Sequence, residues 1–171
     1  WLGGASTIVH LDLHTGLGRT SEHVLIVDYA LAEPARSWLA RVFGANAIRE
    51  STRDPRAYTA VGSLGQWCVA SGIAPDYRFA FAELGTYDNV SVLAGLRAEN
   101  QAAHWAGPDD PRTSRTRARL RELFCPASPQ WRERALADGV ALIARAARGL
   151  AADRAGRPTM RHGTGLGEQG R

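Results

Sequence analysis

The sequence predicts a layered α/β domain. Three short apolar segments have the length and alternation of β-strands, and four further segments carry the apolar period of helices. Their order along the chain is strand, strand, helix, helix, strand, helix, helix, with no internal repeat. This order favours an α/β domain over a helical bundle or a β-sandwich. At 171 residues the chain is long enough for one domain with a substantial core.

The first predicted strand lies within residues 6–18 (STIVHLDLHTGLG) and ends in a glycine-rich turn, where His14 precedes Gly16 and Gly18. Ligands and catalytic groups collect at the carboxyl ends of strands in open α/β sheets, and glycine allows a sharp turn there. His14 is therefore a candidate metal ligand or catalytic imidazole. Asp12 could fix its tautomer by accepting a hydrogen bond. The alternative is a histidine with a purely structural hydrogen bond.

Patterns in the middle of the chain predict one strand and two helices. Residues 22–29 (EHVLIVDY) form the second strand, and residues 33–44 form a helix with Pro34 in its first turn. The next stretch, 45–55, is polar and carries an Asp-Pro turn signal. A short helix is expected at 61–71. Three of its residues are expected to face inward: Leu64, Trp67 and Cys68.

The second half of the chain contains the last strand and two longer helices. Residues 77–85 (YRFAFAELG) form a strand whose aromatic face continues to Glu83 at its end. A helix follows at about 90–105. A Ser-Pro pair then marks the start of a helix expected to span about 129–150. The residues that this helix is expected to bury are Trp131, Leu136, Val140, Ile143 and Ala147.

The formal charge of +4 is carried by arginine alone, because the chain has no lysine. Arginines concentrate at 112–121 and in the segment 145–171. Such clusters could bind nucleic acid, but interleaved aromatic residues and a recognisable nucleic-acid-binding fold are missing. A solvated helix face and a basic tail are the preferred interpretation. Residues 151–171 lack any apolar period and are predicted to be a disordered basic tail after a domain at 1–150.

Composition also limits the possible location and partners. No apolar stretch approaches the ~20 residues needed to cross a bilayer, and no signal peptide is visible. Cys68 and Cys125 lie in unrelated contexts, so they form neither a disulfide framework nor a Cys-x-x-Cys site. This cysteine usage favours a reducing compartment. We therefore expect a cytoplasmic protein without nucleic-acid or membrane partners, and the oligomeric state stays open.

Glu83 is the second candidate for chemistry. Burial at the end of an aromatic strand would raise the pKa of its carboxyl group toward the range of a general base. The alternative is a glutamate that faces solvent or pairs with an arginine. If His14 ends a neighbouring central strand, one imidazole and one carboxylate face the same crevice. That pair is half of a zinc hydrolase site.

Four segments carry a resemblance to a known superfamily: LDLHTGLG at 11–18, AELGTY at 82–87, LRAENQAAHW at 96–105 and LFCPASPQWRERAL at 123–136. In this order and spacing they resemble the C-terminal half of the zinc carboxypeptidase-like superfamily. The most similar branch is a bacterial set described as a domain of unknown function and related to succinylglutamate desuccinylase and aspartoacylase. The resemblance spans about 6–150. It implies a three-layer sandwich with a mixed central sheet flanked by helices, here without its N-terminal strands and helices.

The resemblance also implies functional roles. His14 in DLHTG matches the third zinc ligand, and Glu83 in AELGT matches the general acid/base. The first two zinc ligands of the family come from a His-x-x-Glu motif upstream, which is absent from this chain. Arg97, Glu99 and Asn100 match a recurring RAEN segment, for which a structural role is expected.

The functional expectation is therefore a fragment of a zinc-dependent metallopeptidase or amide hydrolase. Its substrate would be a small molecule or peptide with an amide bond, and zinc would be its cofactor. Carboxypeptidase and deacylase activity are not distinguished. The alternative is a non-catalytic binding module, or an inactive fragment, that retains the fold.

Overall fold

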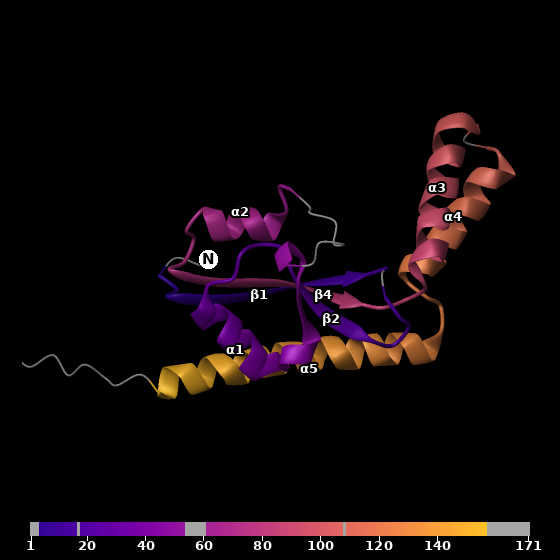
Figure 1. Ribbon diagram of the computed structural model, residues 1–171. Coiled ribbons are helices and arrows are strands. Elements are labelled where there is room, and N and C mark those ends of the chain that lie inside the picture. The colour runs from indigo at the N-terminus through magenta and orange to yellow at the C-terminus, as the bar shows by residue number, and fades with distance from the viewer. Residues whose placement is uncertain (1–3, 17, 54–60, 108, 157–171) are drawn as a thin grey trace, which may run out of the picture.

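A computed structural model describes residues 4–16, 18–53, 61–107 and 109–156 of the chain (Figure 1). Within these residues, four strands form one mixed sheet and five helices surround it, so the predicted α/β class is confirmed. The strands are β1 (Thr7–Thr15), β2 (His23–Val27), β3 (Ile48–Glu50) and β4 (Asp76–Leu84). The helices are α1 (Glu33–Phe43), α2 (Leu64–Ala70), α3 (Asn89–Trp105), α4 (Pro111–Phe124) and α5 (Pro129–Ala155). Short 3₁₀ turns cover Ala45–Ala47 and Ser51–Arg53.

The sheet order is β1-β4-β2-β3. β1 and β4 are parallel along their whole length, from the pair Thr7 and Asp76 to the pair Thr15 and Leu84. β2 runs antiparallel to β4 and parallel to β3. The carboxyl ends of β1 and β4 therefore lie at the same end of the sheet, as the sequence predicted.

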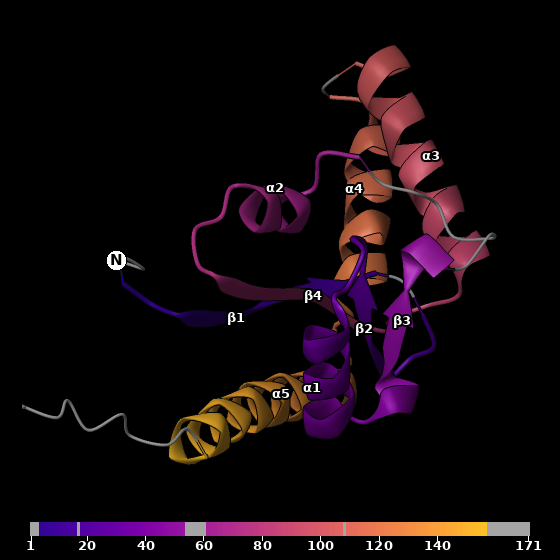
Figure 2. The same ribbon diagram turned by 60° about the vertical axis from the view of Figure 1, so that its left-hand side comes forward.

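Helices cover both faces of the sheet, which gives the predicted three layers (Figure 2). Helices α1 and α5 lie on one face and form the main core with the small residues of β4 and with β2. Helix α2 covers the other face, where Phe79 of β4 lies directly beneath Gly65. Helices α3 and α4 form a hairpin that projects from the end of the sheet (Figure 1). The buried core residues around α1 and α5 include Leu25, Val27, Trp38, Leu39, Ala80, Ala82 and Leu142.

Side-chain caps explain where four of the five described helices begin. Ser63, Asp88, Asp110 and Ser128 each accept a hydrogen bond from a backbone N–H in the first turn of α2, α3, α4 and α5. These N–H groups have no acceptor inside the helix, so each cap gives a hydrogen-bond acceptor to a donor that would otherwise lack one. Proline stands in the first turn of α1, α4 and α5, where its missing N–H costs nothing.

Two elements were not predicted. Strand β3 lies in the polar stretch 45–55, and its three residues are too few to show an alternation. Helix α4 occupies the arginine-rich segment, which the sequence marked only as a solvated helix face. Helix α5 continues to Ala155, five residues beyond its predicted end. The rest of the predicted tail, 157–171, lies outside the described residues.

The predicted inward faces of α2 and α5 were largely wrong. On α5, Trp131 is buried, but Leu136, Val140 and Ile143 are 70%, 58% and 55% exposed, and Ala147 is exposed too. The other buried residues of α5 are instead Gly139, Leu142, Ala146 and Gly149. On α2, Cys68 is buried, whereas Leu64 and Trp67 are exposed.

Close packing explains this difference. A Cβ atom on Gly149 would lie 2.6 Å from Val42 Cγ2, and one on Gly65 would lie 2.0 Å from the Phe79 ring. The packed faces of α5 and α2 therefore need glycine at these contacts, because a larger side chain would hold α5 away from α1 and α2 away from the sheet. Large apolar residues were consequently a misleading guide to the inward face.

Candidate functional site

His14 and Glu83 are direct neighbours in the sheet. His14 of β1 and Glu83 of β4 occupy the same register position of the parallel pair, one residue before the strands end. Because side chains alternate along a strand, both residues lie on the face that also carries Phe79 and Phe81, the face covered by α2. The structure thus brings the two predicted residues to the same end and the same face of the sheet.

The His14 imidazole is half exposed, at 47% of its side-chain area, and is oriented by two neighbours. Its Nδ1 lies 3.3 Å from Asp12 Oδ1, and its ring meets Phe81 edge-on with a centroid separation of 5.0 Å. Asp12 can accept a hydrogen bond from Nδ1–H, which would leave Nε2 as the free lone-pair nitrogen. This arrangement is the one expected of a carboxylate that fixes a histidine tautomer.

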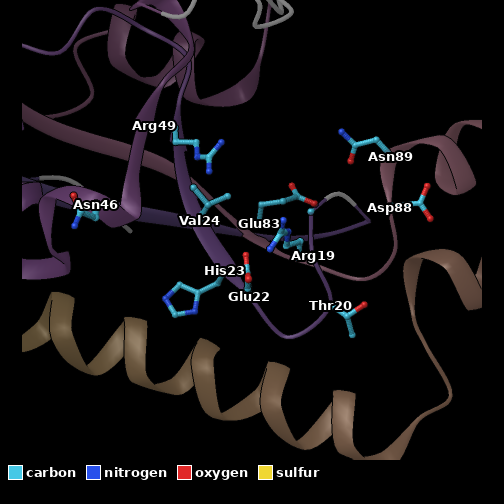
Figure 3. A pocket seen from close by; sticks show the side chains of 11 residues that line it. Arg19, Thr20, Glu22, His23, Val24, Asn46, Arg49, Glu83, Asp88 and Asn89 are labelled. Carbon is cyan, nitrogen blue, oxygen red and sulfur yellow. The ribbon is translucent and has the colours of Figure 1, made fainter.

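Glu83 is buried and forms part of the wall of a cavity of about 720 Å³ (Figure 3). Arg19, Arg49 and Asn89 line the same cavity and are labelled with Glu83 in that view. His23 lines the same cavity, but its Nδ1 lies 3.2 Å from Asp138 of α5. The described residues that line the cavity are Gly18, Arg19, Thr20, Glu22, His23, Val24, Asn46, Arg49, Glu83, Asp88 and Asn89. His14 does not belong to this lining.

Charges of both signs surround the cavity. Arg19 and Arg49 are exposed, and neither forms an ion pair with any residue that the structure describes. Asp88 caps the start of α3, where its carboxylate accepts hydrogen bonds from the Ser91 hydroxyl and backbone N–H. These bonds hold the pKa of the Asp88 carboxyl group below its ordinary value. The two arginines are therefore the groups best suited to bind an anionic group in this cavity.

Sequence reasoning missed both arginines. Arg19 directly follows the HTGLG turn, so its place near the end of β1 could have been inferred. Arg49 lies on β3, and that strand carries no recognisable pattern. No sequence signal could therefore have placed Arg49 beside the end of β4.

The turns that follow β1 and β4 contact each other beside Glu83. Gly16 and Gly18 have φ angles of +131° and +98°, so the turn after β1 needs glycine, as predicted. A Cβ atom on Gly85 would lie only 1.9 Å from the carbonyl oxygen of Arg19. The Gly85 N–H also donates to the Glu22 carbonyl oxygen at 2.8 Å. The turn after β1 is thereby held against the residues that follow Glu83.

The RAEN segment lies on α3, outside the cavity lining. Glu99 Oε1 is 3.6 Å from Arg117 Nε of α4, which links the two helices of the projecting hairpin. Arg97 and Asn100 are exposed. The geometry of Glu99 agrees with the structural role expected for this segment.

The residues present fit only part of a zinc site. A catalytic zinc site needs three protein ligands. Across the described parts of the chain, no group of three or more His, Cys, Asp or Glu side chains could hold a metal ion. His14 is therefore a single candidate ligand, and any zinc site that includes it needs ligands from outside the described residues.

Fold and site together define an α/β domain with a polar, arginine-lined cavity near the carboxyl end of β4. Residues 1–138 match the family described as "Protein of unknown function (DUF2817)", and the chain belongs to this family. No curated protein and no solved structure matches the chain. Among the described helices, none combines the length and the apolar character that crossing a membrane requires.

Proposed function

We propose that this chain supplies the general acid/base and one metal ligand of a zinc-dependent amide hydrolase. The observation that carries the proposal is the shared register position of His14 and Glu83 at the carboxyl ends of two parallel strands. The burial of Glu83 in a cavity wall supports it further. The resemblance to the zinc carboxypeptidase-like superfamily, in the branch related to succinylglutamate desuccinylase and aspartoacylase, assigns the same two roles.

Glu83 would move one proton during the proposed reaction. Its carboxylate accepts a proton from water while the water oxygen adds to the carbonyl carbon of the amide. The C–N bond then breaks, and the Glu83 carboxyl group gives that proton to the leaving nitrogen. One water is consumed, a carboxylic acid and an amine are formed, and Glu83 returns to its carboxylate form.

His14 would hold the zinc ion together with ligands from outside the described residues. Zinc, when bound, lowers the pKa of water and polarises a carbonyl group. Asp12 would keep the imidazole in the tautomer that leaves Nε2 free for the metal. Arg19 and Arg49 would bind an anionic group of a small substrate or peptide. Both cysteines are free, which suits the reducing cytoplasm that we propose as the location.

The test uses the full-length gene product, its zinc content and its hydrolysis of N-acyl amino acids and short peptides. Glu83→Gln should lower turnover at least about 100-fold and leave zinc bound, because it removes only the proton acceptor. His14→Ala should release zinc. His104→Ala, at an exposed position on α3, is the matched histidine control and should change neither quantity. Near-native turnover of Glu83→Gln would refute the mechanism.

The alternative is a binding module without catalysis. It is favoured by the lack of a three-ligand group among the described residues, and by the position of His14 outside the cavity lining. In that case the full-length protein would hold no stoichiometric zinc and hydrolyse no amide. Glu83→Gln would then alter ligand binding without any turnover to lose.

A further inference from the structure

Helices α3 and α4 leave a groove between them on the hairpin that projects from the end of the sheet (Figure 1). Its volume is about 420 Å³, and its lining consists of Leu96 of α3 with Arg117, Leu120, Arg121 and Phe124 of α4. The four residues of α4 follow one another at spacings of three and four, so they form one continuous flank of that helix. The groove therefore combines three apolar side chains with two arginines.

The apolar surface continues along α3. Leu93 lies one turn before Leu96 on the same flank, and the two residues are 62% and 40% exposed. Arg97 lies four residues after Leu93, so it shares this flank, and it is exposed as well. Neighbouring exposed apolar residues with a polar rim are typical of an interaction surface. We call the groove together with Leu93 and Arg97 the hairpin groove.

The hairpin groove is held in shape by contacts between its two helices. A Cβ atom on Gly95 of α3 would clash with the Leu123 side chain of α4, so the helices touch at this glycine. The Tyr87 hydroxyl donates to Glu122 Oε1 at 2.7 Å, which ties the residues before α3 to the last turn of α4. A partner would therefore meet a surface that needs little rearrangement, and this lowers the cost of binding.

The hairpin carries an excess of positive charge. Helices α3 and α4 contain six arginines and only two glutamates. Both glutamates have partners inside the hairpin region: Glu99 lies 3.6 Å from Arg117, and Glu122 accepts two hydrogen bonds. Arg97 and Arg121 form no ion pair with any residue that the structure describes. These two arginines can therefore pair with acidic groups of a partner.

Apolar surface and charge together select one kind of occupant. A second copy bound through the same groove would place arginines against arginines across a two-fold axis, which is unfavourable. Nucleic acid would match the charge, but its phosphate backbone makes no use of the leucines. An amphipathic helix with an acidic flank matches both features. Its apolar face packs between α3 and α4 as a third helix, while its carboxylates reach the arginines.

We propose that the hairpin groove binds an acidic amphipathic helix of a partner protein. The apolar face of that helix packs on Leu93, Leu96 and Phe124, and its carboxylates pair with Arg97 and Arg121. The proposal does not depend on the hydrolase activity.

The test uses a fluorescently labelled helical peptide as the probe. Its leucines follow the spacing i, i+3, i+4 and i+7, and glutamate and alanine occupy the other positions. Fluorescence anisotropy with the 171-residue chain should give a dissociation constant below about 50 μM. A scrambled peptide of the same composition, whose leucines no longer share a face, should bind at least about tenfold more weakly.

Two substitutions test the two parts of the hairpin groove. Leu96→Asp places a carboxylate on its apolar surface, and Arg121→Glu reverses a charge at an exposed position while leaving the apolar surface intact. Each should raise the dissociation constant of the probe at least about tenfold. Leu136→Asp and Arg145→Glu make the same changes at exposed positions of α5. These matched controls should leave the dissociation constant unchanged.

Three results overturn the proposal: no probe binding up to about 500 μM of the chain, equal binding of the scrambled peptide, or an equal effect of the control substitutions. Vesicles of phosphatidylglycerol and single-stranded RNA are tested in parallel. If either binds, loses affinity in Leu96→Asp and Arg121→Glu, and the peptide does not bind, the groove serves a lipid surface or a nucleic acid and the proposal is wrong.

Discussion

The Trp131 indole N–H donates a buried hydrogen bond of 2.8 Å to the carbonyl oxygen of Gly85. Gly85 stands two residues after Glu83, in the turn that leaves β4, and Trp131 stands in the first turn of α5. This bond joins the last helix to the turn beside the candidate general base. The Gly85 N–H is held at the same time by the Glu22 carbonyl oxygen. The backbone N–H and C=O of Gly85 therefore both bond to residues from distant parts of the chain.

Removing the indole N–H should destabilise the fold. Trp131→Phe keeps an aromatic ring but leaves the buried Gly85 carbonyl without its partner, which should cost about 1–3 kcal/mol of the free energy of unfolding. Urea titration followed by circular dichroism measures the loss. Trp67→Phe, at an exposed position on α2, is the control and should change stability by less than about 0.5 kcal/mol. Equal losses in the two variants would show that the hydrogen bond contributes nothing.

A methyl group on Gly85 should also disturb this turn, because it would clash with the turn after β1. Its Cβ would meet the Arg19 carbonyl oxygen at 1.9 Å, and a backbone atom cannot move away as a side chain can. We expect Gly85→Ala to lower the free energy of unfolding by roughly 3 kcal/mol. Gly107→Ala, with no atom within 4 Å of the added Cβ, is the control. Thermal unfolding that shows equal midpoints for both variants would contradict the close approach of the two turns.

The positions of Glu83 and His14 could be predicted because strand alternation and strand ends are local properties. The aromatic alternation of residues 77–81 fixed the face of Glu83, and the glycine turn fixed the end of the strand near His14. The place of Arg49 could not be predicted. It depends on β3, which is three residues long and is defined only by its pairing with β2.

The faces of the helices were harder to predict than their existence. Helices α2 and α5 were expected to bury large apolar residues, yet they pack through Gly65, Gly139 and Gly149. A hydrophobic period identifies which residues share a flank, but the close approach of neighbouring elements decides which flank is packed. That approach is a tertiary property, and in this chain the apolar flank of α5 remains exposed.

The start of α4 should depend on pH. Hydrogen bonds from the Arg112 side chain and backbone N–H lower the pKa of Asp110 from 3.8 to about 2. Because the folded-state pKa is the lower one, the stabilising contribution is complete above about pH 4 and is lost as pH falls through 2. The free energy of unfolding should therefore decrease across this range.

Asp110→Asn isolates this titration, since asparagine also caps a helix but carries no charge. The variant should be less stable than the wild type at neutral pH, and the difference should shrink between pH 4 and pH 2. Chemical denaturation at several pH values measures both curves. A stability difference that stays constant down to pH 2 would exclude Asp110 as a source of the pH dependence.

Arg78 tests whether a buried guanidinium can be replaced by an ammonium group. Its side chain is nearly buried, forms two hydrogen bonds with Asp76 and lies over the Trp38 ring, with 4.4 Å from Cζ to the ring centroid. Lysine keeps the charge but loses the planar, two-pronged geometry and the stacking. Arg78→Lys should therefore cost about 1–2 kcal/mol of the free energy of unfolding. Arg41→Lys is the control, because Arg41 pairs with Asp153 from an exposed position, where a whole ion pair contributes at most about 1 kcal/mol and lysine keeps the charge. Denaturant titration should show a lower free energy of unfolding for Arg78→Lys than for Arg41→Lys. Equal free energies would mean that the stacking on Trp38 and the two hydrogen bonds to Asp76 have no net effect on stability.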